Sequence, residues 1–273
     1  MLSSALAWTQ SILAHSDRAV KCAVKIQNQC RAVIGRSQGA GIIDGERNGE
    51  AMIIRHIRDS LHYFVDVGAN IGMWTETALR APDVRGGLLL EPSEEAVAIL
   101  TQRFGAAAAL RILCAAAGDT AQEVVFYEEP GAGETSSVVF GASDSRCRAK
   151  AVRMTTVDAE IGQLGWSSID YLKIDAEGYD FHVLRGASKL LAAKRVAIGQ
   201  FEYGDAWRLS GNTLTFALHW LADLGYECFL LKGSGLYTPR PEEYGEYFGY
   251  SNYVFCNSDS KALLGSLLRH THL

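Results

Sequence analysis

Two glycines lie four residues apart at the end of a short apolar run, in the segment Phe64-Val-Asp-Val-Gly-Ala-Asn-Ile-Gly-Met-Trp74. A glycine has no Cβ, so the backbone at Gly68 and Gly72 can stay close to a ligand above the end of a strand. The spacing matches neither the G-x-G-x-x-G of a dinucleotide site nor a P-loop. The carboxylate of Asp66 favours a ligand with a cationic or amine group near the turn. The segment therefore predicts a ligand site at a strand-to-helix turn.

A second carboxylate, Glu91, ends the next apolar run about 20 residues further on. At this position a carboxylate can accept hydrogen bonds from both hydroxyls of a ribose. The alternative is that Glu91 merely precedes a helix whose N-cap is Ser93. The glycine turn upstream favours the ribose role.

Short apolar runs alternate with helical patterns from residue 63 onward, which is typical of a parallel sheet covered on both faces. Strands are predicted at 63–67, 87–91, 110–114, 169–175 and 196–202, and helices at 73–80, 94–104, 180–192 and 214–224. Two later runs, 227–232 and 253–256, have no obvious helix between them and are expected to pair antiparallel at one edge. Runs at 123–127 and 151–156 flank a turn-rich segment and predict an inserted hairpin or loop. The predicted fold class is α/β, with a doubly wound, mostly parallel sheet.

The region before residue 48 has a different pattern. Its apolar residues fall at mixed three- and four-residue steps between 2 and 34, which favours amphipathic helix. Five Lys or Arg residues lie between Arg18 and Arg36, with Asp17 as the one acidic residue beside them. Packing on the neighbouring core or on a second subunit is the commoner role of such an arm, and contact with an anionic membrane surface is the alternative. We therefore predict a helical extension at 1–47 and one domain at 48–273.

The composition argues against several classes of protein. Lys and Arg number 26 against 31 Asp and Glu, a net charge of −5, so the chain lacks the basic surplus of a general nucleic-acid binder. The six cysteines are scattered without a C-x-x-C pair, which favours reduced thiols in a cytoplasmic protein. We expect no signal peptide and no transmembrane segment, because no stretch of about 18 apolar residues occurs.

The ordered motifs of this chain resemble those of the FkbM-type methyltransferases, which are class I enzymes dependent on S-adenosylmethionine. The resemblance covers about residues 48 to 257. It is carried by Asp66-Val-Gly-Ala-Asn-Ile-Gly72 with Trp74, Glu91-Pro-Ser93, Ala115-Ala-Ala-Gly-Asp119, Thr156-Val-Asp158, Ile169-Asp-Tyr-Leu-Lys-Ile-Asp-Ala-Glu-Gly178, Val183-Leu-Arg-Gly-Ala187 and Phe201-Glu-Tyr203.

The resemblance implies a Rossmann-like, seven-stranded sheet with an antiparallel edge strand and S-adenosylmethionine bound over the strand ends. It also implies transfer of the methyl group to an oxygen, often a sugar hydroxyl. For cofactor binding, the resemblance implies that Asp66, Gly68 and Gly72 lie near the methionine and ribose portions of S-adenosylmethionine. It also implies that Asn70 lies at the turn, that Glu91 binds the ribose and that Ala116 lies beside the adenine. Cys114 departs from the family pattern, which often has a polar residue such as Asn there.

Three carboxylates are the candidate catalytic residues. Asp175 ends the fourth strand, and Glu177 and Glu202 are expected to point into the same crevice. One carboxylate would accept the proton of the acceptor hydroxyl, with Asp175 as the first choice, or all three would hold a divalent cation such as Mg²⁺. In the structural alternative, Asp175 and Glu177 only complement the positive end of a helix dipole.

Taken with the resemblance, these residues predict a cytoplasmic O-methyltransferase whose partner is a small molecule or glycan with a free hydroxyl. One alternative is a methyltransferase that acts on a membrane-associated glycan, with the basic N-terminal helix in peripheral contact with the membrane. The other is a non-catalytic S-adenosylmethionine-binding module that works by association. A homo-oligomer, formed through the N-terminal helices, is compatible with each of them.

Overall fold

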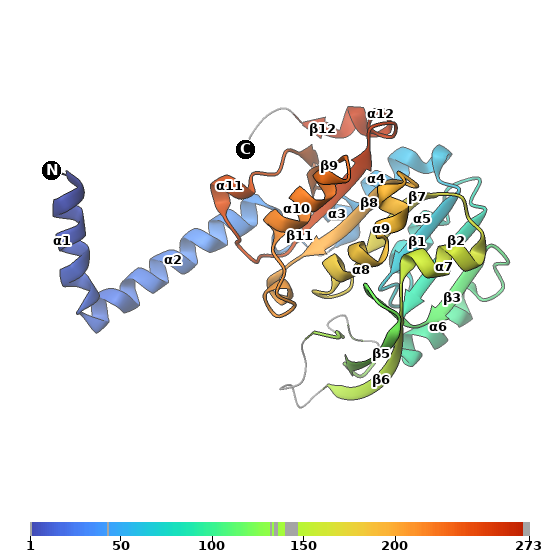
Figure 1. The fold of residues 1–273 in the computed structure, drawn as a ribbon, viewed down its shortest axis with the longest axis horizontal. Coiled ribbons are helices and arrows are strands. Elements are labelled where there is room, and N and C mark those ends of the chain that lie inside the picture. The colour runs from blue at the N-terminus through green and yellow to red at the C-terminus, as the bar shows by residue number, and fades with distance from the viewer. Residues whose placement is uncertain (1, 43, 132, 134–135, 140–146, 270–273) are drawn as a thin grey trace.

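The computed structural model describes residues 2–42, 44–131, 133, 136–139 and 147–269, and Figure 1 shows how their elements are arranged. A nine-stranded sheet runs through the body of the molecule in the order β12-β10-β9-β11-β8-β7-β1-β2-β3. Its strands are β1 (Tyr63–Val67), β2 (Gly86–Glu91), β3 (Leu110–Cys114), β7 (Ile169–Ile174), β8 (Val196–Tyr203), β9 (Tyr226–Lys232), β10 (Gly235–Tyr237), β11 (Ser251–Asn257) and β12 (Leu268–Arg269). Neighbours from β3 to β8 are parallel, which confirms the predicted fold class.

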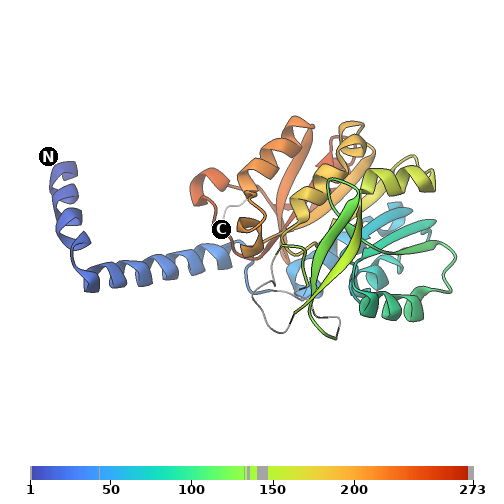
Figure 2. The same ribbon diagram turned by 60° about the horizontal axis from the view of Figure 1, so that its bottom comes forward.

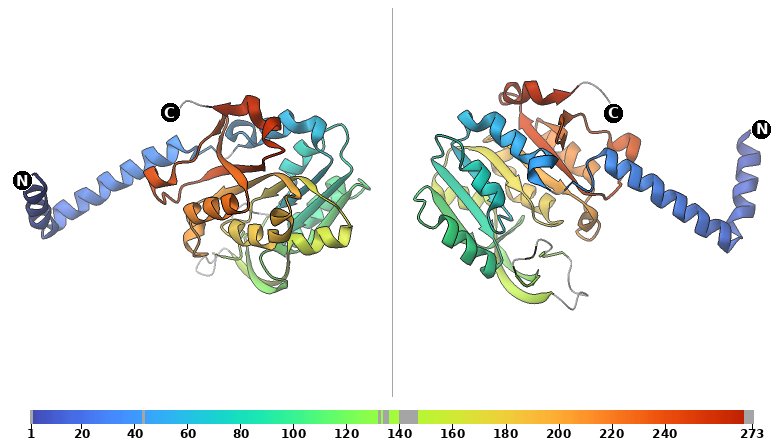
Figure 3. Two further views of the ribbon diagram at one scale, coloured as in Figure 1. Left: turned by 45° about the horizontal axis from the view of Figure 1, so that its top comes forward. Right: turned by 180° about the vertical axis from the view of Figure 1, so that it is seen from behind.

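Helices cover both faces of the sheet (Figure 3). Apolar side chains of α7 (Val157–Leu164), α8 (Asp180–Gly186), α9 (Ser188–Ala192) and α10 (Leu214–Asp223) belong to one core cluster. Those of α4 (Glu50–Ile57), α5 (Met73–Ala78), α6 (Glu94–Phe104) and α12 (Lys261–Leu264) belong to the cluster on the other face. The short helical elements are α3 (Gly45–Asn48), α11 (Pro241–Tyr244), η1 (Arg58–Ser60), η2 (Asp205–Arg208) and η3 (Gly265–Leu267).

Alternation along the strands explains why both faces are apolar. In β1, Phe64 packs into the cluster under α4 and α5, whereas Val65 and Val67 pack into the other cluster. Asp66 and Lys173 share the face of Phe64, because the side chains of a strand alternate with a period of two. The face under α4 and α5 therefore becomes polar toward the carboxyl ends of the strands.

The strand count is nine rather than seven. The seven strands from β3 to β9 include β11, which lies between β8 and β9 and pairs antiparallel with both. The two later apolar runs thus pair as predicted, but β9 is not the edge because β10 and β12 extend the sheet beyond it. These additions are three and two residues long, too short to produce a periodic pattern in the sequence.

The inserted hairpin forms a small second sheet of order β4-β6-β5, from β4 (Ala116–Ala117), β5 (Gln122–Glu128) and β6 (Arg148–Thr155). Strands β5 and β6 pair antiparallel over their length, as the sequence predicts. The sheet has a core of its own, with Phe126, Val152 and Met154 buried around Ala116.

The first two helices, α1 (Leu2–Ala14) and α2 (Asp17–Ser37), project from the body as a bent arm (Figures 1 and 2). Every described side chain from residue 7 to residue 33 is exposed, except the half-buried Ala19. Among the described residues, no helix is long and apolar enough to cross a membrane. All six cysteines are unpaired.

Candidate active site

The turn between β1 and α5 needs glycine because other parts of the chain crowd it. Gly68 has a φ of +74°, and a Cβ there would lie 1.8 Å from the carbonyl oxygen of Asp175. Gly72 has a φ of +84°, and its Cβ would lie 2.4 Å from the ring of Phe104 on α6. The glycines therefore allow the turn to contact the end of β7 and the side of α6. Sequence reasoning had explained the two glycines by the close approach of a ligand alone.

Asn70 and Glu91 meet across this turn. The backbone N–H of Asn70 donates to Glu91 Oε2 at 2.8 Å, and that of Ser93 donates to Glu91 Oε1 at 2.8 Å. Burial raises the pKa of Glu91 to about 7, although both hydrogen bonds favour its ionised form. Ser93 also caps α6, since its hydroxyl accepts from the N–H of Ala96. The helix cap predicted at Ser93 is thus present, and the ribose role of Glu91 stays a prediction.

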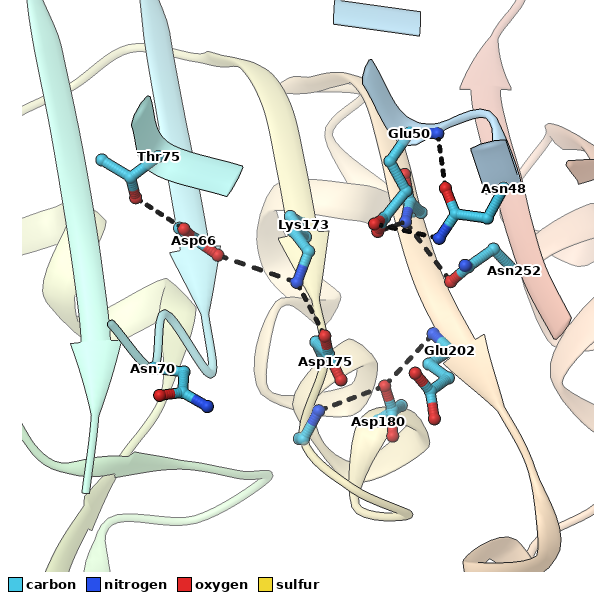
Figure 4. Close-up of polar contacts among 12 residues, drawn as sticks. Asn48, Glu50, Asp66, Asn70, Thr75, Lys173, Asp175, Asp180, Glu202 and Asn252 are labelled. Carbon is cyan, nitrogen blue, oxygen red and sulfur yellow. Dashed lines mark hydrogen bonds and ion pairs between the residues drawn. The ribbon is translucent and has the colours of Figure 1, made fainter. Parts of the chain in front are cut away.

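Lys173 lies buried between two of the predicted site carboxylates (Figure 4). Its Nζ lies 2.9 Å from Asp175 Oδ2 and 4.0 Å from Asp66 Oδ1. Asp66 is fully buried, and its Oδ2 accepts a 2.6 Å hydrogen bond from Thr75. Burial disfavours the ammonium form of Lys173, but the charges of Asp175, Asp66 and Glu50 outweigh burial and hold its pKa well above the ordinary value. Asp66 therefore faces a cation that the protein itself supplies.

The three predicted catalytic carboxylates come together at the ends of β7 and β8. One carboxylate oxygen from each of Asp175, Glu177 and Glu202 lies within 4.8 Å of the other two, and all three residues are partly exposed. Burial raises the pKa of Glu202 well above its ordinary value, and the negative charges of Asp175, Glu177 and Asp180 raise it further. The cluster can thus accept a proton or bind a cation from the crevice.

Asp180, at the start of α8, holds the two sides of this cluster together. Its Oδ1 accepts 3.3 Å hydrogen bonds from the backbone N–H groups of Ala176 and Glu202, and its Oδ2 accepts one of 3.1 Å from that of Gly178. Burial raises the pKa of Asp180 to about 7. Asp180 is a positioning residue because it ties the turn after β7 to strand β8.

Ala116 lies apart from these residues, in the small sheet. Its side chain is buried there with Phe126, Val152 and Met154. An adenine contact at this position would have to come from the backbone, so the predicted role of Ala116 stays a prediction.

Sequence reasoning missed Lys173 and Asp180. A signal for Lys173 was present, because a lysine in the apolar run Tyr-Leu-Lys-Ile of a buried strand requires a charged partner. Its partner could not be named without the register that places Lys173 opposite Asp66. Asp180 carried no such signal, since an acidic residue in the first turn of a helix is ordinary.

Class I methyltransferases hold S-adenosylmethionine at the carboxyl ends of such a sheet, and the fold and the site together define a domain of this class. The model of one family, the methyltransferase FkbM domain, matches residues 66–228, which is more than half of the chain. The chain belongs to this family. No curated protein matches its sequence.

Solved structures with a similar fold are distant in sequence. Methyltransferase FkbM from Methylobacillus flagellatus KT is 14% identical with a TM-score of 0.46, and the match covers 71% of this chain and 43% of that one. An O-methyltransferase from Bacillus cereus is 10% identical with a TM-score of 0.42, over 83% of this chain and 88% of that one. A putative RNA methyltransferase from Pyrococcus horikoshii is 10% identical with a TM-score of 0.37, over 76% and 81%. This chain thus spans less than half the length of the FkbM structure, and these likenesses do not identify an acceptor.

The donor and acceptor groups at the turn fit S-adenosylmethionine. Asn70 Oδ1 is a buried acceptor with no hydrogen-bond partner among the described residues; Asp66 Oδ1 also lacks one, but it lies 4.0 Å from the ammonium of Lys173. A ligand with an ammonium group and ribose hydroxyls supplies the donors that such atoms lack. Each oxygen of Glu91 also keeps a second lone pair beyond its backbone hydrogen bond.

Proposed function

We propose that this protein is an O-methyltransferase that transfers the methyl group of S-adenosylmethionine to a hydroxyl of a sugar or of a glycosylated metabolite. The observation that carries this proposal is the cluster of Asp175, Glu177 and Glu202 beside the glycine turn. A sugar hydroxyl is a poor nucleophile until its proton is accepted, and a placed base contributes roughly 10²- to 10⁴-fold. A module that only binds the cofactor has no use for such a cluster.

S-adenosylmethionine supplies an electrophilic methyl group when it is bound. Asn70 and Glu91 would hold its polar groups, with Gly68 and Gly72 shaping the turn beneath it. The acceptor hydroxyl must lie about 3–3.5 Å from the methyl carbon and in line with its bond to sulfur. The chain's main tasks are therefore to position the hydroxyl and to accept its proton.

Among the three carboxylates, Glu202 is best suited to accept the proton. Asp175 Oδ2 already accepts a 2.9 Å hydrogen bond from the ammonium of Lys173, which leaves less of this carboxylate free for the acceptor. Burial and like charges raise the pKa of Glu202, so its carboxylate binds a proton more strongly. Sequence reasoning put Asp175 first because it could not show this ion pair. Asp175 would orient the hydroxyl instead.

A divalent cation is the alternative use of the same cluster. Three carboxylates within 4.8 Å of one another provide the oxygen ligands that Mg²⁺ prefers, and a bound cation would acidify the hydroxyl. Lys173 already neutralises part of the charge of Asp175, which disfavours this alternative.

The test combines binding with turnover. Calorimetric titration with S-adenosylhomocysteine should show binding, with NAD as the negative control. Transfer of labelled methyl from S-adenosylmethionine is then measured over a panel of sugars, with Mg²⁺ and with EDTA. Glu202→Gln should keep the affinity for S-adenosylhomocysteine and lower kcat by roughly 10²-fold or more. Failure of well-folded protein to bind S-adenosylhomocysteine contradicts the proposal, and activity that EDTA abolishes favours the cation.

The exposed arm supports a second candidate, in which the acceptor is a glycan at a membrane surface. Seven of the fourteen exposed large apolar side chains among the described residues lie on α1 and α2, including Trp8 and Val33, each 69% exposed. Amphipathic helices with Lys and Arg on the polar face bind anionic lipid surfaces. A homo-oligomer formed through the arm and a cytoplasmic location stay predictions.

A further inference from the structure

A cavity of about 350 Å³ lies where α2, α3 and the turn between β9 and β10 meet. Three cationic residues, Arg36, Arg47 and Lys232, line it. Amide and hydroxyl side chains also line it, namely Ser37, Gln38, Asn48, Ser234, Tyr250, Ser251 and Asn252. None of the described lining residues is acidic, although the chain as a whole carries a net charge of −5.

The cations are available to a ligand. None of the ion pairs between described residues involves Arg36 or Arg47, and both residues are exposed. Lys232 is held in place, because its Nζ donates to the carbonyl of Ser37 at 2.9 Å and lies 4.3 Å from the ring centre of Tyr237. Two guanidinium groups and one ammonium group provide the charge and the forked donors that bind a phosphate group.

The cavity borders the carboxylate cluster. Asn252 pairs with Glu202 across β11 and β8, and directly opposite residues of an antiparallel pair place their side chains on the same face, about 5 Å apart. The phenol of Tyr250 accepts hydrogen bonds from Asn48 at 3.3 Å and from Asn252 at 3.1 Å. Figure 4 shows Asn252 between Asn48 and Glu202. A ligand that fills the cavity thus lies next to the groups that act on the acceptor.

We propose that this cavity is a subsite for the phosphate group of a phosphorylated acceptor, whose hydroxyl is methylated beside Asp175 and Glu202. This builds on the proposed methyl transfer and narrows its substrate class. The cavity is larger than a phosphate alone requires, so part of a sugar can occupy it too. Two of the three cations come from the region before residue 48, which therefore belongs to the substrate site.

The first test measures binding of inorganic phosphate to the full-length protein, by calorimetry at low ionic strength. Arg36→Gln/Arg47→Gln should weaken phosphate binding at least about tenfold, because it removes both forked donors. The matched control is Arg18→Gln/Arg31→Gln, which removes the same charge from exposed positions of α2 outside the cavity and should change the affinity less than about twofold. Equal losses in the two double variants, or no phosphate binding by the wild type, would overturn the subsite.

S-adenosylhomocysteine titrations on the same samples separate the two proposals. Arg36→Gln/Arg47→Gln should bind S-adenosylhomocysteine as the wild type does. If the wild type binds phosphate through these arginines but not S-adenosylhomocysteine, the methyltransferase proposal fails and the phosphate subsite stands.

Turnover and vesicle sedimentation then identify the source of the phosphate. For soluble sugar phosphates, the double variant should raise KM at least about tenfold with little change in kcat, and KM for the unphosphorylated sugars should rise much less. If the phosphate belongs to a lipid, the wild type should co-sediment with phosphatidic-acid vesicles but not with phosphatidylcholine vesicles. Arg36→Gln/Arg47→Gln should then lose this co-sedimentation. An equal KM effect on phosphorylated and unphosphorylated sugars contradicts the proposal.

Discussion

At the scale of single residues, the site depends on how its buried charges are balanced. Lys173 faces Asp66 and Asp175, and Glu91 and Asp180 are buried carboxyl groups that accept backbone hydrogen bonds. Burial raises the pKa of Glu91 and of Asp180 to about 7, because it penalises the charged form of each carboxyl group. Substitutions and pH should therefore act on stability as well as on activity.

Removal of the central cation should be costly. Lys173→Met leaves the carboxylates of Asp66 and Asp175 without their partner and should lower the free energy of unfolding by about 3–5 kcal/mol, as measured in urea. Adding Asp66→Asn to this variant should restore part of the loss, because one of the two charges is removed. A loss below about 1 kcal/mol would show that Lys173 does not stabilise the pair.

The raised pKa of Glu91 predicts a specific pH dependence. Between its ordinary value of 4.5 and about 7, folded protein retains a proton that unfolded protein has released. The stabilisation is therefore complete below pH 4.5 and is lost as the pH rises through about 7, and it amounts to about 3 kcal/mol. Glu91→Gln cannot ionise, so the difference in unfolding free energy between wild type and variant should change by this amount across that range.

Urea denaturation at a series of pH values measures this difference. Glu123→Gln, which alters an exposed carboxylate on β5, is the control, and its free energy of unfolding should depend on pH as that of the wild type does. If the unfolding free energies of Glu91→Gln and of the wild type changed equally with pH, this would contradict the raised pKa of Glu91.

At the scale of elements, the sequence predicted most of the fold. The bounds of α6 and β3 agree with the predicted ranges 94–104 and 110–114 because a capping serine and short apolar runs mark them. The helix predicted at 180–192 is instead divided into α8 and α9 near Gly186, whose Cβ would lie 1.9 Å from the carbonyl oxygen of Gly118. Such a contact joins distant segments, so no local pattern reports it. The three carboxylates could be predicted together because strand ends of a parallel sheet share an edge.

The turn after β1 should tolerate no side chain at its first glycine. Gly68→Ala combines a positive φ with a clash against Asp175, and it should lower the free energy of unfolding by about 2 kcal/mol or more and weaken binding of S-adenosylhomocysteine. Gly162→Ala is the matched control, because Gly162 lies within α7 with no atom within 4 Å of the added Cβ. It should raise stability by up to about 1 kcal/mol. Equal effects of the two substitutions in urea denaturation would contradict this account of the turn.

At the scale of the whole molecule, the arm and the body differ in surface chemistry. The arm, residues 2–37, has five Lys or Arg residues against one Asp and exposes half of the large apolar side chains that are exposed in the described structure. The body carries the acidic excess of the chain. The predicted division at residue 47 stays a prediction, and the phosphate subsite would draw on residues from both sides of it.

The arm should bind anionic vesicles in a salt-dependent way. Val24→Ser/Ile26→Ser removes two side chains that are 48% and 60% exposed, and it should reduce co-sedimentation severalfold. Leu209→Ser, at a residue 65% exposed on the body, is the matched control and should have little effect. No vesicle binding, together with a dimer in light scattering that Val24→Ser/Ile26→Ser dissociates, would show instead that the arm joins two copies.

The position of β11 also constrains how the chain is made. β11 lies between β8 and β9, although both of these strands precede it in the sequence. During synthesis the edges of β8 and β9 that pair with β11 therefore stay unpaired until residues 251–257 have left the ribosome. Unpaired strand edges can pair with other chains and so promote aggregation. Because Asn252 arrives with β11 and stands opposite Glu202, the acceptor side of the site is completed only when this late strand enters the sheet.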